Sequence, residues 1–466
     1  MKLYLPFALL PLCHSAAVAR ENFDPLNSAA SVPAQPSLGS NSLSSDLCGS
    51  NALDGVLTLP DVVNTALCNN PQTRLAWLNS RAAAEQIAIS QSAYLPGVDI
   101  NASASHSASG NAVDQRSVVA TVSYLIYDFG SRSANLEISR QLLAAASASQ
   151  DSTVQAVFLE SVRTYYQQQA TLAALNAAKE SERAAHESFL AADARYRAGS
   201  ATPADKLQAQ TAYAQATLNH ITAEGNFKNA QGALANTLGL DANKNVTLEA
   251  ANTSVVTSEF EGDINALIEL AKTIRPDLQA AAAQVKAAQS RVEGARTAGR
   301  PSISASASTS RNYSSGFNTN TSLVGINLSV PIFSGFSTTY KVRVAEVQLD
   351  SSTTQLEQLK SKVALDVWTA VQNLTTATQA MRSSDVLLSS AEQSERVALG
   401  RYKSGVGSML DVLNAQSALA SARQQRVQST FDWNISRATL AQAVGNLDGR
   451  LLQTLMDSVN PAAGIN

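Results

Sequence analysis

The sequence has few of the side chains from which catalytic and metal sites are built. It holds four histidines in 466 residues, at positions 14, 106, 186 and 220, and their scattered spacing is not that of metal ligands. Neither a glycine-rich phosphate loop nor a Gly-x-Ser-x-Gly elbow is present. We therefore expect no catalytic residue, no cofactor and no metal, and we do not expect an enzyme.

Charge is also sparse, since 15% of the residues are charged and the formal net charge is −3. Nothing in this balance attracts nucleic acid. The apolar run Leu3–Leu12 is too short to span a membrane. Preceded by Lys2 and followed by Ala17-Val18-Ala19, it predicts a secretory signal over residues 1–19. Cys13 leaves lipid attachment open, although Leu12 is larger than such a site usually accepts.

Export leaves two of the three cysteines, Cys48 and Cys68, in an oxidising compartment. A disulfide between them is the natural expectation, with two free buried thiols as the alternative. It would close a short loop and contribute about 3 kcal/mol in the loop-entropy description.

One motif occurs twice, as RYRAGSATPAD at residues 195–205 and as RYKSGVGSMLD at residues 401–411, and the offset is 401 minus 195, or 206 residues. Each copy places a glycine where a helix end needs a positive φ, and then Thr202 or Ser408 as the next N-cap. An aspartate three residues later completes a capping-box pattern. Basic residues before the glycine suit the negative end of the helix dipole. Each copy therefore predicts a tight turn between two helices.

The segments that lead into these turns, residues 131–197 and 337–403, predict helices about 100 Å long. Apolar residues keep three- and four-residue spacing along the second of them, as expected for a packed stripe. These are Leu356, Leu359, Val363, Val367, Val371 and Leu374. Alanine and serine fill most other positions, which favours close lateral packing against several neighbours. A plain dimeric coiled coil would need bulkier residues at its seam.

Strict alternation replaces the helical period from Pro96 onward and predicts a strand with one apolar and one polar face. A polar loop at residues 106–116 separates it from a partner strand. The second half repeats the pattern around a loop at 309–320. There the apolar positions of the last strand are Val324, Ile326, Leu328, Val330 and Ile332. Four strands per chain result.

The predicted organisation is therefore two similar halves within one unit. The segments are a signal at 1–19, an extended segment at 20–55, a first half at 56–240 (strand hairpin 96–127, long helix 131–197, return helix 203–238), a linker at 241–262, a second half at 263–446 (strand hairpin 301–333, long helix 337–403, return helix 409–445) and a tail at 447–466. Breaks at Pro71 and Pro276 divide the helices that open each half.

Four such strands cannot stand alone, because open edges and an apolar outer face are both costly. A membrane barrel needs at least eight strands, so several chains with cyclic symmetry are expected to share one.

The doubled order of helix, strand hairpin, long helix, Arg-Tyr-x-x-Gly turn and return helix resembles the outer-membrane factor family of TolC-like trimeric exit ducts. The likeness covers about residues 55–446, and its most specific parts are 195–210 and 401–416, which share Asp-x-Leu-x-Ala-Gln. The resemblance implies an α+β membrane protein: a homotrimer with a 12-stranded β-barrel in the outer membrane and a long α-helical barrel of coiled-coil hairpins in the periplasm.

The same resemblance implies partners, namely outer-membrane lipid, a periplasmic adaptor and an inner-membrane transporter, with no nucleic acid. The function it implies is a passive exit duct for type I protein secretion or small-molecule efflux. The cysteine pair and Leu59-Pro60-Asp61 look most like members that serve protein secretion. Neither the cargo nor the cognate adaptor and pump can be named from the sequence. A periplasmic coiled-coil adaptor or scaffold is the alternative, but it leaves the four strands without a purpose.

The family resemblance also implies two sites. A periplasmic gate would involve Asp411 and Asn414, with Asp205 and Gln208 at the matching positions of the first half. The family carries two acidic residues one helical turn apart where this chain has Asp411 and Asn414, so a weaker closure is expected. Asp411 could instead serve only as a helix cap. Docking of the adaptor is expected at the turns, unless these merely reverse the chain. The docking residues would be Arg195, Tyr196, Ala198, Gly199, Ser200, Arg401, Tyr402, Ser404, Gly405 and Val406.

Overall fold

The computed structural model describes residues 24–33, 55–107, 113–249, 263–314 and 317–445. The predicted signal, Cys13, Cys48 and the tail lie outside these residues. The chain divides into two compact units. The first combines residues 79–144 and 283–352 with the segment before residue 36, and the second holds 145–282, 353–445 and the segment that ends at Leu78. Each unit therefore draws on both of the predicted halves.

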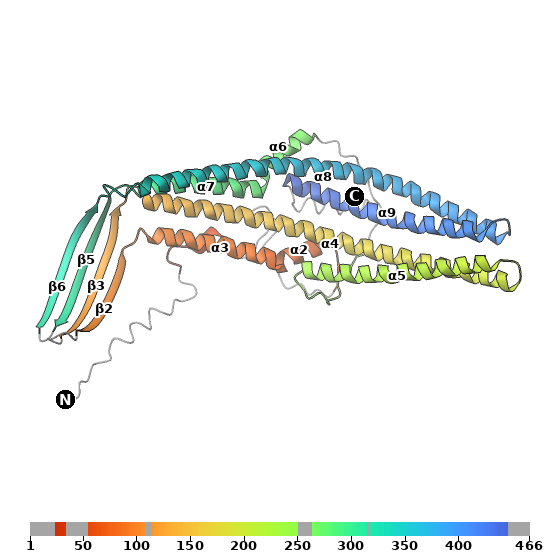
Figure 1. Cartoon of the computed structure of the whole chain (residues 1–466), viewed down its shortest axis with the longest axis horizontal. Coiled ribbons are helices and arrows are strands. Elements are labelled where there is room, and N and C mark those ends of the chain that lie inside the picture. Colours follow the sequence, from red (N-terminus) through yellow and green to blue (C-terminus); the bar gives the residue numbers. More distant parts are fainter. Residues whose placement is uncertain (1–23, 34–54, 108–112, 250–262, 315–316, 446–466) are drawn as a thin grey trace, which may run out of the picture. The chain divides into compact units, whose positions relative to one another are not determined.

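Four helices lead into and out of the two predicted turns (Figure 1). Helices α4 (Ser131–Arg197) and α8 (Ser337–Lys403) have 67 residues each, and both have the predicted bounds. The return helices are α5 (Pro203–Thr237) and α9 (Met409–Val444). The long helices persist because proline is absent from both and glycine occurs only as Gly400.

Two shorter helix pairs are each broken at a proline, as predicted. They are α2 (Leu59–Asn69) with α3 (Pro71–Ser92), and α6 (Ile264–Ile274) with α7 (Pro276–Thr297). Each proline starts the second helix of its pair, where its missing N–H would be unpaired anyway. No helix in the described ranges is both long and apolar enough to cross a membrane.

One antiparallel sheet contains the four predicted strands, in the order β2-β3-β5-β6 (Figure 1). Their bounds are β2 Gly97–Ser107, β3 Val113–Tyr127, β5 Ser302–Ser314 and β6 Phe317–Ser329. Val98, Val122, Ala307 and Val324 lie opposite one another in a single row. Because directly paired residues share a face, this row gives the sheet one apolar side. On β6 it is open, with Val324 82% exposed.

Both hairpin loops are shorter than predicted, so the loop bounds 106–116 and 309–320 are wrong. Pairing continues past the alternating segments to Ser107 with Val113, and to Ser314 with Phe317. Most of these outer residues are polar on both faces, with Phe317 an exception, so the alternation is lost while backbone pairing still extends the strands. The C-terminal end of β6 comes earlier in the sequence than predicted, because the strand ends at Ser329 and leaves out Val330 and Ile332. Pro331 between them has no N–H to donate to a ladder.

The second compact unit holds two large apolar cores. One gathers Val62, Val63, Val162, Leu234 and Leu238, all fully buried. The other contains Val363, Val367, Val371 and Leu374, with Leu356 and Leu359 packed against it, which confirms the predicted stripe on α8. A two-stranded parallel ribbon of β1 (Val56–Leu57) and β4 (Thr247–Leu248) was not predicted, nor was the short helix η1 (Ser28–Ser31).

The break in each short helix pair is joined to the end of a return helix. Asn70 Nδ2 donates to the Thr237 carbonyl at 3.0 Å. Arg275 Nη1 donates to the Ala443 carbonyl at 3.2 Å, and Arg275 also forms ion pairs with Asp277 and Asp366. These hydrogen bonds pair carbonyl groups in the last turns of α5 and α9 with side chains at the proline breaks.

Cys68, near the end of α2, is disulfide-bonded. Its predicted partner Cys48 is outside the described residues, so that pairing stays a prediction.

Candidate functional site at the helical turns

Both predicted turns adopt the same glycine-dependent geometry. Gly199 and Gly405 have φ of 71° and 77°, in the left-handed region that favours glycine. The N–H of Ser200 donates to the Arg195 carbonyl at 2.9 Å, and the N–H of Val406 donates to the Arg401 carbonyl at 3.0 Å. These bonds satisfy carbonyls that a helix end otherwise leaves unpaired, as in the Schellman motif.

Each return helix begins with a capping box, which confirms the predicted pattern. Asp205 N–H donates to Thr202 Oγ1 at 3.2 Å while Thr202 N–H donates to the Asp205 carboxylate at 3.0 Å. Ser408 and Asp411 repeat this with distances of 3.1 and 3.2 Å. Hydrogen bonds from the side chain and backbone N–H of Ser408 lower the pKa of Asp411. Asp411 is therefore ionised at neutral pH and caps α9.

Arg195 of the first turn binds directly to the second turn. Its Nη2 donates to the carbonyls of Tyr402 at 2.9 Å and Lys403 at 3.3 Å. The guanidinium carbon lies 4.2 Å from the centre of the Tyr402 ring, a cation–π contact. That ring is 6% exposed and packs with Met409 and Val412. One arginine thus links the ends of α4 and α8.

The matching residues of the other turn behave differently. Tyr196, the counterpart of Tyr402, is 40% exposed and has Lys206 Nζ 5.3 Å from its ring centre. Arg401, the counterpart of Arg195, is exposed. Of the ten predicted docking residues, Tyr402 therefore contributes to a core and Arg195 is half-buried. The exposed ones are Tyr196, Ala198, Gly199, Ser200, Arg401, Ser404, Gly405 and Val406.

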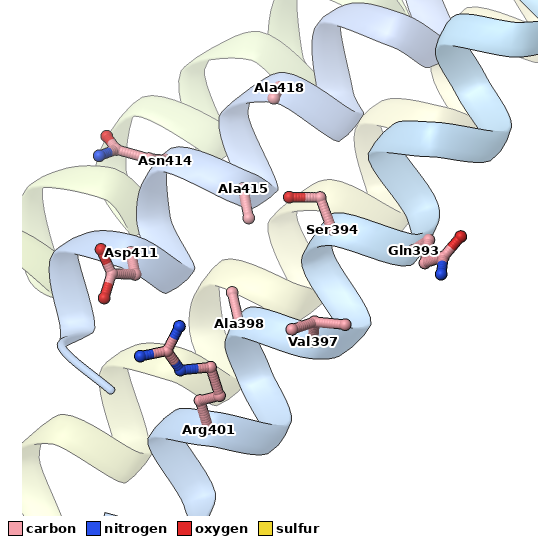
Figure 2. A pocket seen from close by; sticks show the side chains of 9 residues that line it. All are labelled: Gln393, Ser394, Val397, Ala398, Arg401, Asp411, Asn414, Ala415 and Ala418. Carbon is pink, nitrogen blue, oxygen red and sulfur yellow. The ribbon is translucent and has the colours of Figure 1, made fainter. Parts of the chain in front are cut away.

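A pocket of about 540 Å³ lies beside the second turn, between α8 and α9 (Figure 2). Arg401 of α8 points toward Asp411 of α9, and Asn414 lies one helical turn beyond that aspartate (Figure 2). The positive charge of Arg401 contributes to the lowered pKa of Asp411, after the Ser408 hydrogen bonds. The remaining lining residues are Gln393, Ser394, Val397, Ala398, Ala415 and Ala418.

The structure brings two of the four predicted gate residues together, Asp411 and Asn414, in this pocket. Asp205 and Gln208 lie on α5 and do not line it; Gln208 is exposed. The α8 wall, including Gln393 and Ser394, was missed by sequence reasoning. Three- and four-residue spacing along α8 up to Arg401 was the available signal.

The polar groups of the pocket are one carboxylate, one guanidinium, two side-chain amides and one hydroxyl, and its four other lining residues are apolar. Within the described ranges no three His, Cys, Asp or Glu side chains are grouped so that they could hold a metal ion.

Residues 62–240 and 267–446 match the outer membrane efflux protein family. The chain belongs to this family. Protein CyaE of Bordetella pertussis is 27% identical over 401 residues, covering 84% of each chain. Outer membrane protein TolC of Vibrio cholerae is 23% identical, covering 84% of this chain and 91% of that one. The Campylobacter jejuni CmeC outer membrane channel has the same fold, with a TM-score of 0.74 and 21% identity over 86% of this chain and 89% of that one.

Membership of the outer membrane efflux protein family confirms the resemblance inferred from the doubled motif. The protein is an exit duct of the outer membrane that extends into the periplasm and serves efflux or type I secretion. The solved neighbour CmeC is described as an outer membrane channel.

Proposed function

We propose that three copies of the chain form a homotrimer whose twelve strands close one barrel in the outer membrane. The observation that carries this proposal is the open sheet. Strands β2 and β6 are its edges, and each pairs with one neighbour among the described strands. Unpaired edges are costly in lipid, an exposed apolar face is costly in water, and four strands are too few to close a barrel. Pairing β6 of one copy with β2 of the next removes both edges.

The mass of the detergent-solubilised complex tests this arrangement. We expect a stable trimer, about 3 × 48.9 kDa before removal of any signal. A well-folded monomer in mild detergent would contradict the proposal.

The duct is passive, and its periplasmic turns receive an adaptor that links it to an inner-membrane pump. The exposed residues at both turns support this role. Val406 is 69% exposed, and a Cβ on Gly199 or Gly405 would meet no atom within 4 Å. Val406→Asp changes this surface without touching the Tyr402 core, so we expect it to reduce export while trimer levels stay normal. Unchanged export with normal trimer would indicate that the turn only reverses the chain.

The periplasmic mouth is closed at rest near Asp411 and Asn414. In a trimer this position supplies three carboxylates and three amides, so ion repulsion and cation binding are weaker than in a ring of six carboxylates. The proposal rests on the pocket in which the carboxylate of Asp411 and the amide of Asn414 lie together.

Because Asp411 is also a cap, Asp205→Asn serves as the matched control for Asp411→Asn. The two aspartates occupy equivalent capping boxes. A gate predicts that Asp411→Asn alone weakens cation selectivity and divalent block of single channels in planar bilayers. Equal, small stability losses with unchanged selectivity would leave Asp411 as a cap.

A further inference from the structure

His220 of α5 forms a short hydrogen bond with Glu182 of α4. Its Nδ1 lies 2.6 Å from Glu182 Oε2, and Thr217 Oγ1 donates to the other carboxylate oxygen at 2.6 Å. The side chains of His220 and Glu182 are 25% and 21% exposed, so the pair is shielded but open to protons. Two side chains of α5 are thus hydrogen-bonded to one carboxylate of α4.

The second pair of helices has a different group at the matching position. Arg426 follows His220 by 206 residues, the same offset that relates the two turns. Its Nε pairs with Asp385 of α8, and its Nη1 donates to Thr430. Arginine is never deprotonated in proteins, whereas histidine changes charge between about pH 5 and 8. The Arg426–Asp385 link therefore has a permanent positive charge, whereas the His220–Glu182 link has a basic group whose charge can change with pH.

We propose that His220 makes the α4–α5 pairing sensitive to protons, so that acidification tightens this hairpin while the Arg426–Asp385 link leaves α8–α9 unaffected. Protonation adds a positive charge to the donor of a hydrogen bond whose acceptor, Glu182, is already ionised, so the contact becomes an ion pair and is strengthened.

The sign of the effect follows from Glu182. Hydrogen bonds from Thr217 and then from His220 lower the pKa of this carboxyl, so it stays ionised while histidine titrates. Its own contribution is present above its usual pKa of 4.5 and is lost only as the pH falls through the lowered value. A change in protection above that value therefore does not come from Glu182, and histidine is the kind of side chain that changes charge between about pH 5 and 8.

Other charged groups from both helices surround the pair. On α4, His186 lies four residues beyond Glu182, acts on its charge, and holds its ring 4.7 Å from that of Tyr213. On α5, Glu224 forms an ion pair with Lys228 at 2.6 Å, and the charge of Lys179 on α4 also lowers the pKa of Glu224. Because His186 is a second histidine close enough to act on the charge of Glu182, the experiment must separate the two histidines.

Hydrogen exchange on the full-length, detergent-solubilised protein at pH 7.5 and 5.5, corrected for intrinsic exchange rates, measures each hairpin separately. In the wild type, we expect peptides around Glu182 and His220 to be about two- to fivefold better protected at pH 5.5. Peptides around Asp385 and Arg426 should not change.

The natural pair of residues supplies matched variants. His220→Arg should make the protection of α4–α5 independent of pH, and Arg426→His should give α8–α9 a pH dependence of its own. His186→Asn should keep the wild-type response. If His220→Arg does not fold, His220→Gln should give weaker protection that is flat with pH. A wild-type response that survives in the His220 variants, or that is equal in both hairpins, would overturn the proposal.

Discussion

Replacing Arg195 tests whether one side chain holds the two turns together. Its guanidinium donates to two carbonyls of the other turn and stacks on the Tyr402 ring. A charged hydrogen bond contributes about 1.5–3 kcal/mol and a cation–π contact at a half-exposed site about 0.5–1 kcal/mol. Taking the low end of both, because part of the contact faces solvent, Arg195→Ala should weaken the link by about 2 kcal/mol.

Local opening of the turns is the quantity to measure. About 2 kcal/mol corresponds to roughly thirtyfold in an opening constant, which hydrogen exchange or limited proteolysis at residues 198–202 and 404–408 can resolve. Arg195→Lys should show an intermediate effect, since a lysine cannot reproduce the forked contact.

Arg401→Ala is the matched control, because Arg401 holds the equivalent position but is exposed. It should change opening by less than about 0.5 kcal/mol. If Arg195→Ala and Arg401→Ala open the turns equally, the asymmetric link described here is not what holds them.

Three further changes have definite outcomes. Gly239→Ala should lower the melting temperature much more than Gly199→Ala: both glycines have positive φ, but a Cβ at Gly239 would lie 2.5 Å from the Asn69 carbonyl oxygen, whereas one at Gly199 meets nothing within 4 Å. Burial raises the pKa of Tyr165 and Tyr166 to about 12, so absorbance at 295 nm should show both still protonated at pH 11. The stability that they contribute should be fully present below about pH 10, the usual pKa of tyrosine, and should be lost as the pH rises through 12. Reduction should add about two hydrogens to the mass of the peptides containing Cys48 and Cys68; alkylation of both thiols in folded, unreduced protein would disprove their pairing.

The helices could be predicted because their ends are marked by residues with few other uses. Glycine at positive φ, proline at a first turn and Thr or Ser three residues before an aspartate each specify a boundary locally. The C-terminal ends of α4 and α8 and the starts of α5 and α9 follow from these marks. Strand ends carry no such marks where both faces are polar, which is why the β2–β3 and β5–β6 loops came out too long.

The site was only partly predictable, for a different reason. Asp411 and Asn414 share a helix face, so their proximity follows from spacing alone. The contact of Arg195 with Tyr402 joins residues 207 apart and depends on how α4 and α8 pack. Nothing in the two related motifs indicates that Arg195 crosses to the other turn while Arg401 faces a pocket.

The contacts of Asn70 with the end of α5 and of Arg275 with the end of α9 differ chemically between the two halves of the chain. One contact uses a neutral amide, and the other uses a cation held by Asp277 and Asp366. At the position of Asp277 the first half has Gln72. A chimera built from two first halves would have only the neutral Asn70 contact at both proline breaks and would lack the Arg275 ion pairs. Transplanting Arg275 by itself would bring a half-buried charge without one of its carboxylates. Redesign of this duct by swapping halves must therefore move each contact residue together with all of its partners.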